Sequence, residues 1–271
     1  MTEGRVELRE GVLYGRGGGR ELKCDVFIPP GKPTNAPGLF VIHGGSWRSN
    51  TPAVMRGYGF LFGRDGYVVV MPEYRLSGEA QWPAQMHDLK AALRWMHANA
   101  AELGVDPGRI AVLGNSAGGH LALMMAGTRN TPKFDGTGGS PGASADCAVV
   151  INLYGITSVE PDGDFLQDSL KDLLGPNAGR DVYREASPVE YVDEHFPPTC
   201  TLQSREDLTV PPAQSWLLYE ALQRAGVTTE IHMYDRIGHQ LDETREVSRQ
   251  VVQISLLFLQ RFMGPAAVAV K

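Results

Sequence analysis

The chain alternates short runs of apolar and β-branched residues with longer segments in which apolar residues recur at helical spacing. Continuous apolar runs are typical of strands that are buried on both faces of a parallel sheet. The predicted inner strands occupy residues 37–42, 67–71, 109–113, 148–154, 199–203 and 230–234, and the main helical segments occupy residues 84–101, 165–174, 213–225 and 243–262. This order predicts an α/β fold, with a mostly parallel central sheet and helices on both of its faces.

The first part of the chain has a different pattern, which predicts a pair of antiparallel edge strands. These are residues 6–13 and 21–28, and the glycine-rich segment 14–20 joins them. A run of glycines could also form a phosphate-binding loop. No helical segment follows this run and no Lys-Ser/Thr pair closes it, so the pattern favours a hairpin turn.

Two segments interrupt the alternation of strands and helices. Residues 131–145 are rich in Gly, Ser and Pro, which indicates a surface loop. Residues 155–198 are too long for a plain connection, and we expect a small cap insertion over the carboxyl edge of the sheet, where open α/β sheets bind ligands. Since no repeat or linker divides the chain, we expect residues 1–271 to form one domain.

Residues 114–118, Gly-Asn-Ser-Ala-Gly, form a G-x-S-x-G sequence between a predicted strand and a helix-prone segment. In that context the sequence predicts a sharp turn that presents the serine hydroxyl above the sheet. The turn also lies at a helix N-terminus, where the peptide dipoles and free N–H groups favour developing negative charge. Ser116 is therefore the predicted nucleophile.

A nucleophilic serine needs a base, and the base needs an acid that fixes its tautomer. With this kind of turn, the three groups follow one another along the chain in the order Ser, Asp/Glu, His. Asp207 and His239 each follow one of the last two predicted strands, and they are the predicted acid and base. The neighbouring carboxylate, Glu206, remains an alternative acid.

Three other histidines fit the position of the base less well. His232 lies inside a predicted strand, and His195 lies in the predicted cap, before the penultimate strand. His120 lies in the helical segment that follows Ser116, where we expect it to pack against its neighbours.

The predicted strand 37–42 ends in His43-Gly44-Gly45-Ser46-Trp47. Glycines allow backbone N–H groups to point into a site without obstruction by side chains. We expect the N–H groups of Gly45, Ser46 and Ala117 to form an oxyanion hole, and we expect His43 to be structural. Trp47, Asn115 and residues of the cap segment 155–198 are predicted to lie in the wall of the substrate pocket.

Composition narrows the classes of function. The formal net charge is −6 and no basic cluster is found, which argues against binding of nucleic acid. No apolar run approaches the length of a membrane span, and Met1–Arg5 shows no apolar signal core, so we expect no membrane association and a cytoplasmic location. The three cysteines are expected to be buried thiols, and no metal-ligand spacing or cofactor motif is found.

Taken together, these motifs resemble the α/β-hydrolase superfamily, and within it the esterase/lipase branch that includes bacterial feruloyl and acetyl-xylan esterase-like proteins. The resemblance is carried by residues 25–29, 43–47, 74–76, 82–84, 88, 94–95, 104–110 and 114–122. It implies Ser116, Asp207 and His239 as the triad, and Gly45, Ser46 and Ala117 as the oxyanion donors. It also implies that no cofactor is needed.

The chain departs from the usual pattern of those relatives at three places. Gln203-Ser204 stands where relatives carry His-Gly, Asn115 stands where hormone-sensitive-lipase-like relatives carry Asp, and Ser46 stands where those relatives carry a third glycine. Ser46-Trp47 is similar to the kynurenine formamidases. Because of these departures, the resemblance predicts the mechanism more directly than it predicts the substrate.

The expected function is a serine carboxylesterase that acts on short acyl or aryl-acyl esters, such as acetyl or feruloyl groups carried by small molecules or oligosaccharides. An amide hydrolase of the arylformamidase or small-peptidase type is an alternative. A catalytically silent hydrolase-fold binding protein is an alternative of another class. A histidine base also implies that activity falls on acidification.

Overall fold

The computed structural model describes residues 4–31 and 33–266. In this part of the chain the strands form one eight-stranded sheet in the order β1-β2-β4-β3-β5-β6-β7-β8. The strands are β1 (Glu7–Gly17), β2 (Arg20–Ile28), β3 (Ala36–Ile42), β4 (Val68–Pro72), β5 (Val105–Asn115), β6 (Val149–Leu153), β7 (Thr199–Ser204) and β8 (Thr229–Tyr234). From β4 to β8 all neighbouring strands are parallel, whereas β1 and β2 pair antiparallel at one edge. The predicted α/β class with a mostly parallel sheet is confirmed.

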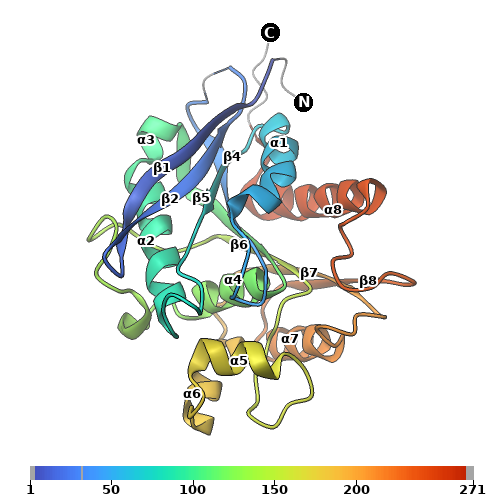
Figure 1. Ribbon diagram of the computed structural model, residues 1–271. Coiled ribbons are helices and arrows are strands. Elements are labelled where there is room, and N and C mark those ends of the chain that lie inside the picture. Colours follow the sequence, from blue (N-terminus) through green and yellow to red (C-terminus); the bar gives the residue numbers. More distant parts are fainter. Residues whose placement is uncertain (1–3, 32, 267–271) are drawn as a thin grey trace.

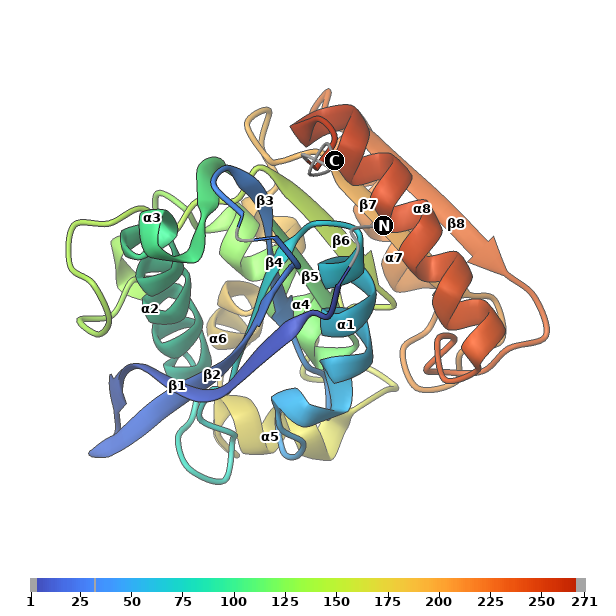
Figure 2. The ribbon, with the colours of Figure 1, turned by 90° about the horizontal axis from the view of Figure 1, so that it is seen from above.

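Helices cover both faces of the sheet (Figures 1 and 2). They are α1 (Arg56–Arg64), α2 (Ala84–Ala98), α3 (Ala100–Leu103), α4 (Ala117–Gly127), α5 (Gln167–Leu174), α6 (Arg180–Glu185), α7 (Ala213–Arg224) and α8 (Arg245–Met263), with 3-10 turns η1 (Pro52–Met55), η2 (Pro132–Phe134) and η3 (Pro188–Tyr191). One hydrophobic core packs α1 and α8 against one face, and a second packs α2, α4 and α7 against the other. The inner strands β3, β4 and β6 are almost entirely apolar because both of their faces are buried in this way, whereas the edge strand β8 is only half-buried and carries polar residues.

The glycine-rich segment near the N-terminus forms a hairpin, as expected, but its turn is shorter than predicted. β1 continues to Gly17 and pairs with β2 as far as Arg20, so the turn consists of Gly18 and Gly19 alone. Both glycines have a positive φ, of 59° and 83°, a conformation that favours glycine over other residues. The predicted loop 14–20 was too long because Tyr14 is a buried strand residue despite its glycine neighbours.

Helix α1 was not predicted from the sequence. It contains three glycines, which lower intrinsic helix propensity and weaken the periodic pattern. Gly59 is needed there because a Cβ atom at this position would lie 2.6 Å from the ring of Phe27. The close approach of α1 to the sheet therefore explains why a helix is built from a sequence with poor helical signals.

The predicted cap segment, residues 155–198, contains α5, α6 and η3. It contacts the loops that follow β3 and β4: Arg48 forms an ion pair with Asp172 at 2.8 Å, and the backbone N–H of Trp82 donates to the carbonyl of Leu173 at 2.8 Å. Its helices lie below the sheet in Figure 1, close to α4 and α7.

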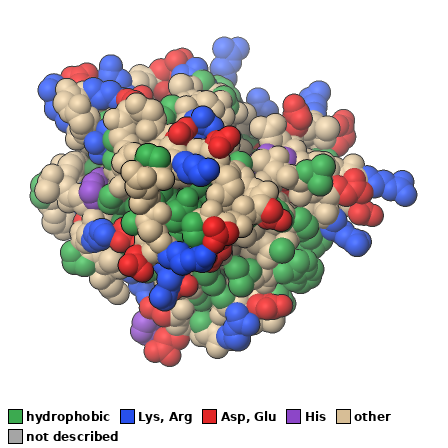
Figure 3. Space-filling model, turned by 60° about the horizontal axis from the view of Figure 1, so that its bottom comes forward, with side chains coloured by type: hydrophobic (Ala, Val, Ile, Leu, Met, Phe, Trp, Pro, Cys, Tyr) green, Lys and Arg blue, Asp and Glu red, His purple; other side chains and the backbone are tan. Residues whose placement is uncertain are grey.

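Surface charge and helix length concern the expectations about nucleic acid and membranes. Acidic and basic side chains are interspersed over the face shown in Figure 3, without a single basic patch. Among the described residues, no helix is both long and apolar enough to cross a membrane. Met1–Glu3, the start of the segment expected to carry no signal core, lies outside the described residues.

Candidate active site

Ser116 lies at the sharp junction between β5 and α4, where its backbone has φ 53° and ψ −121°. A positive φ is strained for a residue with a side chain, and such strain is found at active sites. The turn is possible because of its glycines. A Cβ atom at Gly114 would lie 2.1 Å from the carbonyl oxygen of Gly118, and one at Gly118 would lie 2.1 Å from that of Ile42. The sequence thus forms the strand–turn–helix geometry expected around the nucleophile.

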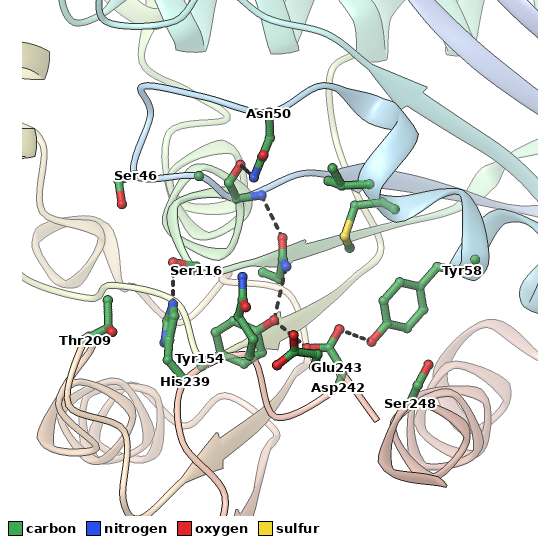
Figure 4. A pocket seen from close by; sticks show the side chains of 17 residues that line it. Ser46, Asn50, Tyr58, Ser116, Tyr154, Thr209, His239, Asp242, Glu243 and Ser248 are labelled. Atoms are coloured by element: carbon green, nitrogen blue, oxygen red, sulfur yellow. Dashed lines mark hydrogen bonds between the residues drawn. The ribbon is translucent and has the colours of Figure 1, made fainter. Parts of the chain in front are cut away.

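The structure brings the three predicted triad residues together from three loops (Figure 4). His239, on the loop between β8 and α8 (residues 235–244, the histidine loop), places Nε2 3.0 Å from Ser116 Oγ. Its other nitrogen, Nδ1, lies 2.7 Å from Asp207 Oδ2. With a carboxylate at Nδ1, the proton of a neutral imidazole lies on that nitrogen, and Nε2 is free to accept the serine proton.

Asp207 is buried and receives four hydrogen bonds. Oδ2 accepts from His239 and from Gln203 Nε2 at 3.1 Å, and Oδ1 accepts from the backbone N–H groups of Thr209 and Val210, each at 2.9 Å. Burial alone would raise the pKa of Asp207, but the hydrogen bonds from His239 and the two N–H groups outweigh it and hold this pKa below its usual value. The carboxylate therefore stays charged beside the imidazole.

The alternative acid, Glu206, is exposed, and no hydrogen bond or ion pair to its side chain is found among the described residues. The geometry thus places Asp207 at the position of the acid. The rival histidines also lie where expected. His232 is in β8, His195 is exposed in segment 155–198, and His120 is buried in α4.

The loop after β3, residues 43–47, contains the candidate oxyanion donors and is called here the His-Gly-Gly loop. The N–H of Gly44 donates to Asn115 Oδ1 at 2.7 Å, so it is already engaged. Gly45 and Ser46 have positive φ values of 118° and 53°, and within the described residues no acceptor is found for their N–H groups. Both residues line the cavity above Ser116, and Ala117 starts α4 with a helix N-terminal N–H.

A cavity of about 470 Å³ extends from Ser116 and His239 between the His-Gly-Gly loop and α1 on one side and the histidine loop on the other. It is lined by Gly44, Gly45, Ser46, Asn50, Val54, Met55, Gly57, Tyr58, Asn115, Ser116, Tyr154, Thr209, His239, Gln240, Asp242, Glu243 and Ser248. This set contains two carboxylates, several amides and hydroxyls, and no Lys or Arg. Residues 155–198 contribute nothing to its lining.

The two residues predicted for the pocket wall lie in different places. Asn115 lines the cavity. Trp47 is fully buried beneath the His-Gly-Gly loop, where its Nε1 donates to His120 Nδ1 at 3.3 Å, and it is not part of the lining. His120 Nε2 in turn donates to the carbonyl of Ala186 at 2.7 Å, and burial lowers the pKa of His120 to about 4. This histidine therefore joins the loop to segment 155–198 as a neutral group.

His43 is buried and stacks on Tyr74, with ring centroids 4.5 Å apart. The Nδ1 atom of His43 lies 2.8 Å from the carbonyl oxygen of Gly44, and Tyr74 Oη donates to the carbonyl oxygen of His43 at 2.9 Å. Burial lowers the pKa of His43. These contacts are consistent with the structural role expected for it.

Sequence reasoning missed four residues around the site. Gln203 donates a hydrogen bond to Asp207, while Tyr58, Tyr154 and Asp242 line the cavity. Some signals existed: Gln203 stands at a departure from the pattern of relatives, Tyr154 follows a buried parallel strand, and Asp242 comes three residues after His239. No sequence signal marked Tyr58, because α1 was not predicted.

The described residues contain one further group with metal-ligand chemistry. Cys200, Glu230 and His232 share one face of β7 and β8, and their ligand atoms lie within 4.8 Å of one another. Arg261 forms an ion pair with Glu230 and already balances its charge. The group is not part of the cavity at Ser116.

The chain is similar to known esterases over most of its length. The BD-FAE family model matches residues 24–222. The esterase LipQ of Mycobacterium tuberculosis is 32% identical over 237 residues, which cover 80% of this chain and 53% of LipQ. The esterase LipC of the same organism is 30% identical over 225 residues, which cover 79% of this chain and 55% of LipC. The chain thus spans about half the length of these relatives.

Among solved structures, esterase 2 of the Planctomycetes species Thermogutta terrifontis superposes with a TM-score of 0.81 at 23% sequence identity. The match covers 98% of this chain and 95% of that one. At this identity the likeness concerns the fold, and it confirms the α/β-hydrolase fold that the sequence resemblance implied. The chain belongs to the BD-FAE family.

Proposed function

We propose that the protein is a serine carboxylesterase that hydrolyses short-chain acyl or aryl-acyl esters. The observation that carries this proposal is the continuous contact from Ser116 Oγ to His239 Nε2 at 3.0 Å and from His239 Nδ1 to Asp207 Oδ2 at 2.7 Å. Membership of the BD-FAE family and the esterase names of LipQ and LipC support the same reaction class.

In the proposed reaction, Ser116 Oγ attacks the ester carbonyl carbon while His239 Nε2 takes its proton. The C–O bond to the alcohol then breaks, and the imidazolium returns the proton to the leaving oxygen. Water, deprotonated by His239, attacks the acyl-enzyme and releases the acid and free Ser116. Asp207 holds the Nδ1 proton and stabilises the imidazolium in both steps.

The tetrahedral intermediate carries a negative oxygen, which needs hydrogen-bond donors that are already in place. The N–H groups of Gly45, Ser46 and Ala117 are the proposed donors, because Gly44 is engaged by Asn115. Loss of one such donor costs about 2.7–4 kcal/mol of transition-state stabilisation in comparable enzymes.

The cavity favours small polar esters over long acyl chains. Its volume is about 470 Å³, and its lining includes the polar groups of Tyr58, Tyr154 and Asp242. A long apolar chain would exclude water from the charged carboxylate of Asp242, and burial of a charge is costly. We therefore propose acyl groups of the acetyl and feruloyl type, carried by small molecules or oligosaccharides whose hydroxyls can bond to the polar lining.

Hydrolysis of a p-nitrophenyl ester series from acetate to octanoate, with methyl ferulate and N-formylkynurenine alongside, tests this proposal. We expect turnover to peak at short esters and to fall at least about a thousandfold in Ser116→Ala. Ser144→Ala is the matched control, since this exposed serine lies on the surface loop 131–145. Undiminished turnover in Ser116→Ala would contradict the mechanism, and preference for the formamide would move the assignment to amide hydrolysis.

A further inference from the structure

Asp242 lies near the α8 end of the histidine loop and lines the cavity beside Tyr154, away from Ser116 (Figure 4). Its carboxylate accepts hydrogen bonds from two tyrosines on other elements: Tyr58 of α1 bonds Oδ2, and Tyr154, which follows β6, bonds Oδ1. Among the described residues, no Lys or Arg forms an ion pair with Asp242. The two hydroxyls are therefore the main partners of this carboxylate.

The contact with Tyr154 continues across the cavity to the His-Gly-Gly loop. Asn115 Nδ2 donates to Tyr154 Oη at 3.1 Å, and Asn115 Oδ1 accepts from the N–H of Gly44 at 2.7 Å. In each of these hydrogen bonds the donor-to-acceptor direction is the same, from Gly44 through Asn115 and Tyr154 to Asp242. Asn115 and Tyr154 each accept a hydrogen bond on one side and donate one on the other, which favours cooperative strengthening.

This network also contacts the base directly. The ring of Tyr154 packs edge-on against that of His239, with centroids 4.9 Å apart and an angle of 72° between planes. Burial, and next the charge of Asp242, raise the pKa of both Tyr58 and Tyr154 well above its usual value. Both phenols therefore remain protonated and keep donating to Asp242.

The histidine loop has an irregular backbone around His239. Arg236 and Gln240, on either side of it, have positive φ values of 58° and 59°. On the β8 side the loop is held by Ser204 Oγ, which donates to the carbonyl of Ile237. On the α8 side Asp242 makes the corresponding contact, so His239 lies between two attachments.

We propose that Asp242 is a positioning residue for the proposed esterase reaction, which couples His239 to the His-Gly-Gly loop through Tyr154 and Asn115. The inference depends on the proposed function, because it assigns Asp242 an effect on that same site. Through this coupling the base and the oxyanion donors keep one relative position. Tyr58 anchors the same carboxylate to α1 without taking part in the route to Asn115.

A double-mutant cycle between Asp242→Asn and Asn115→Ala tests the coupling, with kcat and KM measured on p-nitrophenyl acetate. We expect each single variant to lower kcat about tenfold with a smaller change in KM, and the double variant to lose little more than the worse single variant. Losses in the double variant that equal the product of the single losses would overturn the proposal.

Two matched tyrosine variants show whether the route matters or only local stability. Tyr154→Phe and Tyr58→Phe each remove one hydroxyl from Asp242 and keep the ring. Tyr154→Phe should be strongly non-additive with Asn115→Ala, whereas Tyr58→Phe should be additive with it. If both tyrosine variants showed the same degree of additivity with Asn115→Ala, the proposal would be overturned. The two tyrosine variants also test the coupling if Asp242→Asn folds poorly.

The downfield proton resonance of the His239–Asp207 hydrogen bond gives a readout that needs no substrate. We expect it to shift or broaden in Asp242→Asn and Tyr154→Phe, and to stay unchanged in Asp235→Asn, which removes an exposed carboxylate from the same loop. An unchanged resonance in all three variants would overturn the proposal. Absence of Ser116-dependent turnover in the wild type would instead contradict the proposed function, while this spectrum would still test the coupling.

Discussion

The buried carboxylate of Asp207 is surrounded by hydrogen-bond donors that stabilise its negative charge. Asp207 is 3% exposed and fills its acceptor positions with His239, Gln203 and two backbone N–H groups. A buried carboxylate with fewer donors would lose much of its preference for the charged form. Gln203 is itself held by Ser215 Oγ, which donates to its Oε1 at 2.9 Å.

Gln203→Met should reduce activity without removing any of the three triad groups. The unbranched apolar side chain fills similar space but donates no hydrogen bond to Asp207, and a lost hydrogen bond to a charged group corresponds to roughly a tenfold loss or more. We expect kcat on p-nitrophenyl acetate to fall about tenfold while KM changes little. Wild-type kcat in a folded Gln203→Met variant would show that the other three donors suffice for Asp207.

His120 makes the folded protein sensitive to acid. Burial lowers its pKa to about 4, whereas the unfolded chain protonates histidine near pH 6.5. Between these values the unfolded state binds the extra proton, so the free energy of unfolding falls as the pH falls through this window. His43, whose pKa burial also lowers, acts in the same direction.

His120→Gln should therefore flatten the pH dependence of stability. A glutamine can still accept from Trp47 and donate to Ala186, but it does not titrate. We expect the drop in unfolding free energy between pH 7 and pH 5 to be about 2 kcal/mol smaller in the variant than in the wild type. Urea unfolding at both pH values measures this, with the exposed His195→Gln as control. If the unfolding free energy fell by the same amount between pH 7 and pH 5 in the wild type, His120→Gln and His195→Gln, the role assigned to His120 would be contradicted.

Much of the candidate site could be predicted at this scale, because Ser116, Asp207 and His239 follow a fixed order at the ends of strands. Residues that support them were harder to find. Asp242 bonds Tyr58 and Tyr154, which lie far from it in the sequence, and no spacing rule connects them. Gln203 lies only four residues before Asp207, but its place in a predicted strand does not reveal that its amide reaches this carboxylate. Trp47 was predicted for the pocket wall because it lies in the His-Gly-Gly loop, but that position does not reveal that its side chain turns into the core.

At the scale of elements, the junction of β5 and α4 requires close backbone contacts. Gly118 lies against the carbonyl of Ile42 at the end of β3, so that α4 can start directly above the sheet. The parallel strands were predicted well because burial on both faces leaves continuous apolar runs. Helix α1 could not be predicted, because its three glycines lower helix propensity, and two of them, Gly59 and Gly63, allow close packing against Phe27 and Val6 instead.

Gly118→Ala should destabilise the protein strongly. Its Cβ would lie 2.1 Å from a backbone oxygen, which cannot move without shifting β3. We expect a loss of about 3 kcal/mol or more in unfolding free energy, measured by urea. Gly78→Ala is the control, since no atom lies within 4 Å of a Cβ placed there, and it should change stability by less than about 0.5 kcal/mol. If Gly118→Ala and Gly78→Ala had similar free energies of unfolding, this account of the junction would be contradicted.

At the scale of the whole molecule, the site is assembled from segments that are distant in sequence. The cavity combines residues 44–58, 115–116, 154 and 209–248 at the carboxyl ends of the parallel strands. The alternating pattern predicted this edge as the location of the site, following the general rule for α/β sheets. It could not predict which segments close the cavity. In particular, no residue of segment 155–198 lines the cavity, although a cap was expected there. Residues of η1, α1 and the histidine loop line it instead.

The central claim is that Ser116 is an activated nucleophile in an esterase. Labelling with a fluorophosphonate, followed by intact mass measurement, peptide mapping and residual p-nitrophenyl acetate turnover, tests it most directly. The account predicts one adduct per chain, located on Ser116, with turnover lost in proportion to labelling and no adduct in Ser116→Ala. An unlabelled but active protein, or full turnover after stoichiometric modification of Ser116, would contradict it.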